Sequence, residues 1–299
     1  MIPFIKYKNF FIGLTLLVIV ASIGAIASYK LKLGIEFTGG SVISLEYKAA
    51  RPDNSVIQEK IAALNLGEAP TVYAEGEKGV IIRAVTLDTA THAKVLEALK
   101  ETGEFEEKSF ESIGPVVGKE LTSKMTVLVL ISLVAMLIYI AIAFKSVPGP
   151  VSSWQYGVAS FLILCHDVLV PLGVFAVLGA FYGVQITIPI ITALLIVVGY
   201  AINNVIVVYD RIRENLVRDH RAKFEEIADR AINQTLSRQI NTSVATLLPV
   251  FALYFWAGDS LKYFALALIL GITVGTYSSV FLASQILAVW MDFDKKRGN

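Results

Sequence analysis

Polar residues interrupt several long apolar stretches of this 299-residue chain, and they are the residues best placed to do chemistry. In chain order they are His166-Asp167, Asn203-Asn204, and Arg238 with Asn241 and Thr242. A charge near the middle of a bilayer costs at least about 2.5–3.5 kcal/mol on insertion scales, so polar groups retained there are usually functional. We take these residues as the candidate site.

Asn204 and Arg238 are equally far from Arg221, the midpoint of the charged segment that joins their two apolar stretches. If the two stretches form a hairpin with arms of equal length, both residues lie at the same depth and face one another. Neither side chain changes its charge near neutral pH, so this pair alone cannot carry a titratable proton. A carboxylate at position 204 could.

Structural roles are the alternative for each of these residues. Arg238 could extend to the headgroups at the start of its helix, and Asn203-Asn204 could hydrogen-bond between helices. Asp167 either lines a polar interior or pairs with another subunit, and a metal phosphohydrolase site at His166-Asp167 is disfavoured because partner ligands are missing. The small residues Gly271, Gly275 and Ser279 indicate close helix packing.

The composition places the chain in a lipid bilayer, because 55% of its residues are hydrophobic and only 17% are charged. A net charge of +1 gives no basis for nucleic-acid binding. A single cysteine, Cys165, excludes an internal disulfide, and three dispersed histidines predict no metal site. No local nucleophile pattern is present, so we do not expect an enzyme.

Six stretches reach the roughly 20 apolar residues that a membrane-spanning helix needs. They are residues 10–29, 125–144, 157–179, 187–208, 239–256 and 263–290. The first also resembles a signal peptide, with Lys6 and Lys8 before it and Ala25-Ile26-Ala27 near its end. We favour an uncleaved anchor, because the apolar run continues through the cleavage pattern. The predicted fold class is a polytopic α-helical membrane protein.

Positive residues in short loops predict which ends of the spans are cytoplasmic. With six spans, four groups fall on one side: Lys6 and Lys8; Lys145; Arg211, Arg213, Arg218, Arg221, Lys223 and Arg230; and Lys295, Lys296 and Arg297. Both termini and the loop at about 209–237 are therefore expected in the cytoplasm. Residues 30–124 are then extracytoplasmic, between a first part at 1–29 and a last part at 125–299.

The extracytoplasmic segment predicts a small α+β domain. Alternation over residues 42–47 predicts a half-buried strand, and helical spacing marks residues 56–64 and 93–99. Residues 71–84 read as a hairpin around Glu75-Gly76-Glu77-Lys78, and 105–113 as a last strand. The order β-α-β-β-α-β predicts a ferredoxin-like arrangement.

Six stretches in the right order carry a resemblance to a known family. They are Gly34 to Gly40, Ser112 to Gly118, His166-Asp167, Val198 to Glu214, Asn233 to Thr242 and Phe264 to Ser279. Together they resemble the SecD/SecF family of the resistance-nodulation-division superfamily, across nearly the whole chain. No phosphate-binding G-x-x-x-x-G-K-[ST] motif accompanies them.

The resemblance implies an accessory subunit of protein export in the bacterial cytoplasmic (inner) membrane. Such a subunit pairs with SecD, associates with the SecYEG channel and helps to draw unfolded exported polypeptides outward. Its implied energy source is the proton gradient, with no cofactor. The implied proton relay includes Asn204, opposite Arg238.

One departure from the family pattern concerns position 204. The family usually has Asn-Asp where this chain has Asn203-Asn204, and that aspartate is the supposed proton carrier. Three explanations are open: an engineered Asp→Asn change, a natural loss of coupling, or a carboxylate supplied by SecD. We rank the engineered change slightly above the others, because an amide preserves shape while removing titration.

Two other functions compete with export. A small-molecule or lipid exporter of the same superfamily would share the intramembrane polar residues, although such exporters usually hold two six-span halves in one chain. A scaffold that only holds export components together would need no titratable group at position 204. Co-purification with SecD and proton-flux measurements separate these classes.

Overall fold

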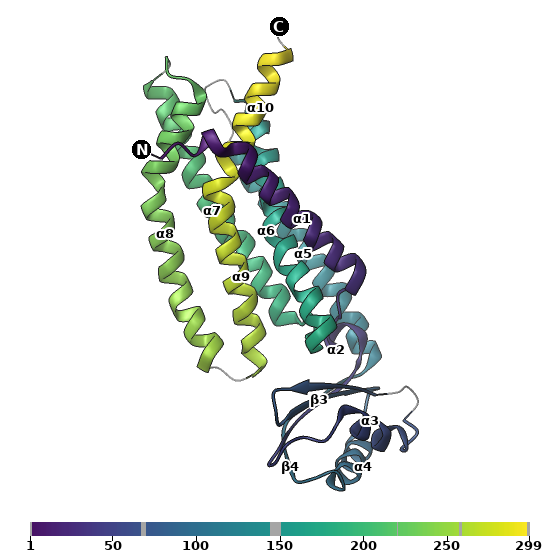
Figure 1. Ribbon diagram of the computed structural model, residues 1–299. Helices are drawn as coiled ribbons and strands as arrows, with labels where there is room; N and C mark the ends of the chain where they lie inside the picture. The colour runs from purple at the N-terminus through teal and green to yellow at the C-terminus, as the bar shows by residue number, and fades with distance from the viewer. Residues whose placement is uncertain (1, 67–69, 144–150, 220, 257–258, 298–299) are drawn as a thin grey trace. The chain divides into compact units, whose positions relative to one another are not determined.

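The computed structural model describes residues 2–66, 70–143, 151–219, 221–256 and 259–297 (Figure 1). The elements are η1 Ile5–Tyr7, α1 Lys8–Tyr29, α2 Ile35–Thr38, β1 Gly40–Tyr47, α3 Asn54–Ala62, β2 Thr71–Glu75, β3 Gly79–Ala84, α4 Thr89–Lys100, β4 Phe105–Ile113, α5 Pro115–Ala143, α6 Ser153–Tyr182, α7 Ile188–Arg218, α8 Phe224–Trp256, α9 Asp259–Phe281 and α10 Ala283–Arg297. The chain divides into two compact units. The helical unit comprises Met1–Ser28, Val129–Val174 and Pro189–Asn299, and the mixed unit comprises Tyr29–Leu128 and Phe175–Ile188.

Five helical stretches within the described residues are long and apolar enough to cross a membrane. They are Ile5–Tyr29, Pro115–Ile140, Ser153–Tyr182, Ile188–Arg218 and Leu261–Phe293. Each contains one of the predicted spans or most of it. The predicted span 239–256 lies in α8, where the polar residues Gln239, Asn241 and Thr242 lower the mean hydropathy, and it stays a prediction.

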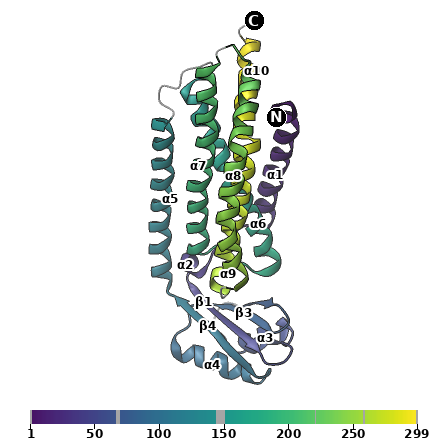
Figure 2. The same ribbon diagram turned by 90° about the vertical axis from the view of Figure 1, so that its left-hand side faces the viewer.

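The helical unit packs small and branched side chains at its centre. Ala159, Ala201 and Ala283 are completely buried there, in one cluster with larger residues of α6, α7 and α10. Helices α8 and α9 lie side by side in both views (Figures 1 and 2). The predicted last span is divided at Leu282, although the Leu282 N–H still donates to the Ser278 carbonyl, so the backbone hydrogen bonding continues.

The start of the chain meets the beginning of α8 and the later part of α10 at one end of the helical unit. The Ile5 N–H donates to Asp229 Oδ1 at 2.8 Å, and Lys8 pairs with Asp292. Three of the four predicted positive groups therefore lie at the same end. Lys145, the fourth, lies outside the described residues.

The mixed unit contains a four-stranded antiparallel sheet in the order β2-β3-β1-β4. The elements follow one another as β-α-β-β-α-β, the order expected from the sequence. On β1, Ile43, Leu45 and Tyr47 are buried against α3 and α4, whereas the residues between them are more exposed. The half-buried strand predicted over residues 42–47 therefore exists.

Two features of local chemistry fix the ends of elements in the mixed unit. Asp88 caps α4, because its carboxylate accepts a hydrogen bond from the Thr91 N–H at 2.8 Å. Gly39 and Gly40 have φ values of +73° and +123°, a region that side chains with a Cβ rarely adopt. The Gly-Gly pair thus permits the turn from α2 into β1.

Strand β4 forms one edge of the sheet; four of its nine residues are charged, and five are exposed. Lys108 lies 2.9 Å from Glu46 on β1 and 3.2 Å from Glu106 on its own strand. Lys108 lowers the pKa of Glu46, chiefly by donating a hydrogen bond to it. A charged edge of this kind discourages pairing with foreign strands.

Candidate functional site

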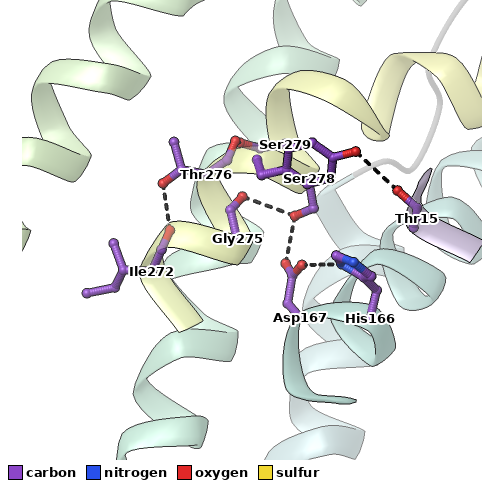
Figure 3. Close-up of polar contacts among 9 residues, drawn as sticks. Thr15, His166, Asp167, Ile272, Gly275, Thr276, Ser278 and Ser279 are labelled. Carbon is purple, nitrogen blue, oxygen red and sulfur yellow. Dashed lines mark hydrogen bonds and ion pairs between the residues drawn. The ribbon is translucent and has the colours of Figure 1, made fainter. Parts of the chain in front are cut away.

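Asp167 and His166 form the centre of a polar cluster inside the helical unit (Figure 3). Asp167 is 0% exposed and His166 is 4% exposed. Asp167 Oδ1 lies 2.9 Å from His166 Nδ1, and Asp167 Oδ2 accepts a hydrogen bond from Ser278 Oγ at 2.8 Å. Of the two roles left open for Asp167, the structure shows a polar interior within its own chain.

Small residues on α9 make room for this cluster. A Cβ on Gly275 would lie 3.1 Å from Ala201 Cβ and 3.5 Å from Asp167 Oδ2, and a Cβ on Gly271 would lie 2.3 Å from Val197 Cγ2. Helix α9 therefore approaches α7 closely along the side that carries Gly271 and Gly275. Ser279, the third small residue of the stripe, is buried beside Gln239.

Gln239 and Ser243 connect α8 to its neighbours, and neither was among the candidate residues. Ser279 Oγ donates to Gln239 Oε1 at 2.5 Å. Tyr200 Oη donates to Ser243 Oγ at 2.9 Å, and Ser243 lies 2.6 Å from Thr276 Oγ1. Gln239 and Ser243 are four residues apart and so lie on one face of α8. This spacing is the sequence feature that could have predicted a polar contact face.

Asn204 and Arg238 differ in their surroundings. Asn204 is 3% exposed, and its Nδ2 has no hydrogen-bond partner within the described residues. Helices α7 and α8 run in opposite directions, and Tyr200 of α7 contacts Ser243 of α8. Asn204 lies four residues after Tyr200 and Gln239 four residues before Ser243, so Asn204 and Gln239 lie at about the same level. Arg238 directly precedes Gln239 in the sequence but is exposed, because successive residues of a helix are turned by about 100° about its axis.

The remaining candidates share the exposed side of the helices. Asn203, Arg238, Asn241 and Thr242 are all exposed in this chain. Among the contacts of the described residues, no hydrogen bond joins Asn204 to Arg238, so their pairing stays a prediction. Sequence spacing concerns only depth along the two helices and carries no information on the rotation of α8 about its axis.

Arg238 lines a cavity of about 240 Å³ between α7 and α8. The cavity has charged walls from α7, where Arg211 pairs with Glu214 at 2.6 Å and Arg213 lies 3.8 Å from Asp210. Gln234 and Thr235 of α8 complete its polar lining.

The cluster does not resemble a hydrolytic site. Ser278 donates to Asp167, whereas a serine nucleophile needs the imidazole itself as its base. No group of three or more His, Cys, Asp and Glu side chains able to hold a metal ion occurs within the described part of the chain. The arrangement is a buried carboxylate that contacts an imidazole and accepts a hydrogen bond from a hydroxyl group.

A second polar contact fastens the turn after α6 to the sheet of the mixed unit. The Arg83 guanidinium donates to the Gly183 carbonyl and lies 4.8 Å from the centre of the Tyr73 ring. Gly183 has a φ of +69°, and a Cβ there would lie 2.3 Å from the Tyr73 ring. Burial lowers the pKa of Arg83 to about 10, while Tyr73 opposes that shift.

Long apolar helices with a buried polar interior, together with a small α+β unit, define a multi-pass helical membrane protein. The family signature "Protein export membrane protein SecD/SecF, C-terminal" matches residues 94–293, and "SecD/SecF GG Motif" matches residues 24–50, which contain Gly39-Gly40. The chain belongs to the SecD/SecF family of protein-export membrane proteins.

Its relatives include separate and fused subunits. The chain is 36% identical to the protein translocase subunit SecF of Thermobaculum terrenum over 98% of its own length and 95% of the relative. It is 35% identical to SecF of Vibrio alginolyticus, over 95% and 88%. The crystal structure of SecDF from Thermus thermophilus, a translocon-associated membrane protein, is similar with a TM-score of 0.85 and 32% identity. That similarity covers 97% of this chain and 38% of the SecDF chain, so this chain spans about two fifths of the fused protein.

Proposed function

We propose that this chain acts with SecD in Sec protein export and uses the proton gradient to assist the passage of unfolded polypeptides through the SecYEG channel. The observation that supports this most directly is the His166–Asp167 pair, buried inside a bundle of membrane-length helices in a chain of the SecD/SecF family. Ionisable groups at such depth usually belong to ion or proton pathways. In this proposal the proton gradient is the energy source, and no cofactor is used.

The proposed topology has six spans, with α8 as the fifth, and both termini in the cytoplasm. Support comes from the positive residues gathered near the start of the chain, the α7–α8 connection and α10. Residues 30–124 then form the extracytoplasmic domain, between parts 1–29 and 125–299. Its strand order β2-β3-β1-β4 supports a ferredoxin-like classification. The membrane is the bacterial cytoplasmic membrane.

Proton transfer can drive motion of an outer domain on energetic grounds. One elementary charge moving through 100 mV releases about 2.3 kcal/mol, so a few protons can switch a domain between two orientations. The cargo contact is assigned to residues 30–124, the part on the outer side in this topology. Asn204 and Arg238 remain the relay positions implied by the family resemblance.

The exposed polar residues favour SecD as the partner. Asn203, Arg238, Asn241 and Thr242 would face lipid if α7 and α8 were not covered at that level, and lipid contact with a charge costs about 2.5–3.5 kcal/mol. Helices of SecD would cover them, in keeping with relatives in which both parts form one SecDF chain. A carboxylate from SecD is one of the three explanations for Asn204.

Reconstitution with SecD and SecYEG tests the proposal. Export into proteoliposomes should depend on the proton gradient, Arg238→Ala should reduce that dependence at least tenfold, and Asn204→Asp should restore or increase it. Arg218→Ala is the matched control, because Arg218 is exposed near the end of α7. Export that does not depend on the proton gradient in any variant would favour the scaffold function. A stable homotrimer without SecD would favour a small-molecule or lipid exporter.

A further inference from the structure

We propose that His166 and Asp167 form a proton-binding site of this chain, loaded through polar groups buried between α6, α7 and α10. The inference deepens the proposed function, on which its role in export rests. The binding of the proton itself depends only on this chain. The site differs from position 204, where an amide stands.

Asp167 has the contacts of a group that exchanges a proton. A carboxylate can accept about four hydrogen bonds, and Asp167 receives one from Ser278 and shares one with His166. Its side chain is completely buried. An ionised carboxylate without a cation is costly in such surroundings, and a bound proton removes that cost.

The described groups that contact the pair include no lysine or arginine. Helix α9 contributes Ser278, Gly275 and Tyr277, whose ring centre lies 6.5 Å from that of His166. Helix α7 contributes Ala201, and α1 contributes Thr15, 3.4 Å from the Tyr277 hydroxyl. Within the described residues, Asp167 has neither a lysine nor an arginine partner. His166 is therefore the group that shares charge with it.

The charge and proton balance is simple. In the unloaded state neither Asp167 oxygen carries a proton and His166 is neutral. The pair then has a net charge of −1. A hydronium ion then transfers one proton to an Asp167 oxygen: one O–H bond of the hydronium ion breaks, an O–H bond on Asp167 forms, a water molecule remains, and the pair becomes neutral. Release breaks the same bond and returns the proton to water.

Buried polar atoms without partners lead from this pair toward the α7–α8 end. Ser160 lies seven residues before Asp167 on α6, which is two turns along the same face and about 10 Å along the axis. Ser160 Oγ, Asn204 Nδ2 and Ser284 Oγ are buried, and none has a hydrogen-bond partner within the described residues. Buried polar groups of this kind usually bind internal water.

Two contacts place these atoms in order. The rings of Tyr156 and Tyr209 are 5.0 Å apart, and Tyr209 Oη donates to the Ala283 carbonyl at 3.1 Å, next to Ser284. Asn204 lies on α7 between Ala201, level with Asp167, and Tyr209. In this proposal, internal water molecules bound at Ser160 and Asn204 connect Asp167 with the part of the helical unit that contains Ser284.

Infrared difference spectroscopy of the full chain in liposomes, titrated from alkaline to acidic pH, tests the site. We expect a carboxylic acid C=O band that grows as the pH falls and is lost completely in Asp167→Asn. Asp53→Asn is the matched control, because Asp53 is an exposed carboxylate of the mixed unit. It should leave the band unchanged.

Two further variants keep the test decisive if Asp167→Asn does not fold. Ser278→Ala should retain the band but move it to higher frequency, because the carbonyl oxygen loses a hydrogen bond. Ser160→Val should slow the deuterium-induced shift of the band at least tenfold, because the water path is blocked. A band that Ser278→Ala does not move, or one that does not change with pH, would overturn the proposal.

The measurement separates this site from the proposed function. Infrared detection needs neither SecD nor cargo, so a chain that shows the band but gives no gradient-dependent export contradicts the function and leaves the site intact. Gradient-dependent export with no Asp167 band contradicts the site and leaves the function intact.

Discussion

The two units of the chain differ in the polar side chains that they bury and in the apolar side chains that they expose. In the mixed unit, Ile43, Leu45 and Val95 form an apolar core, while charges such as Lys108 are at the surface. In the helical unit, Asp167 is buried, while Leu17 is 66% exposed. The mixed unit is arranged for water and most of the helical unit for lipid, so burial of apolar area stabilises the first more than the second.

Packing of the apolar core should have the largest effect on the mixed unit. We expect Leu45→Ala to lower the opening free energy of β1 by about 2–5 kcal/mol, because it leaves a cavity in a well-packed core. Hydrogen exchange of the full chain in a bilayer measures this. Leu17→Ala, which removes an equal side chain from the lipid-facing side of α1, should change α1 by less than about 0.5 kcal/mol. Equal losses would contradict the comparison.

Close backbone approach should matter most in the helical unit. Gly271→Ala should cost about 1–3 kcal/mol, because its new Cβ would overlap Val197. Thermal unfolding in detergent compares it with Gly199→Ala, which meets no atom within 4 Å. Adding Val197→Ala to Gly271→Ala should recover part of the loss. An additive double variant would show that the two residues do not press on one another.

Hydrogen bonds between helices should contribute less. Ser243→Ala removes the link between Tyr200 and Thr276, and we expect a loss of about 0.6 kcal/mol, the average for such bonds inside membranes. Ser237→Ala, at an exposed position of α8, is the control and should have no effect. A loss well above about 1.7 kcal/mol would mean that polar contacts dominate the unit.

The smallest effect concerns a buried carboxylate of the mixed unit. Burial raises the pKa of Glu36, opposed by backbone hydrogen bonds from Glu36 and Ile188. The folded unit thus binds this proton more tightly than the unfolded chain, so the ionised group costs stability at neutral pH and the cost disappears as the pH falls through the raised pKa. Glu36→Gln should therefore be more stable at neutral pH and equal in acid. Denaturation at two pH values measures the difference, and the reverse trend would contradict it.

The sequence predicted the elements of the mixed unit well, because period-two and helical patterns are local. The strand at Phe105–Ile113 has the predicted bounds, and the hairpin around Gly76 is present. Contacts of the segment 175–188 with Tyr73 and Arg83 were not foreseen, since they join residues about 100 positions apart and depend on the positive φ of Gly183.

In the helical unit, residue type identified polar positions but not the directions in which they point. Asp167, Asn204 and Ser279 are buried, whereas Arg238 and Asn241 are exposed. Gln239 was not predicted, because the neighbouring Arg238 is the charged residue of the two. Rotation about a helix axis is decided by the neighbouring helices, and the glycines that bring α9 against α7 act only once that packing exists.

The charged edge of the sheet at β4 has a consequence under the proposed function, in which residues 30–124 meet extended polypeptides. Any unfolded polypeptide passing such a domain could add to a bare edge as an extra strand and remain there. Lys108 and its acidic neighbours make that addition weak. Under the proposed function, an exported polypeptide that met this edge would be released rather than retained as an added strand.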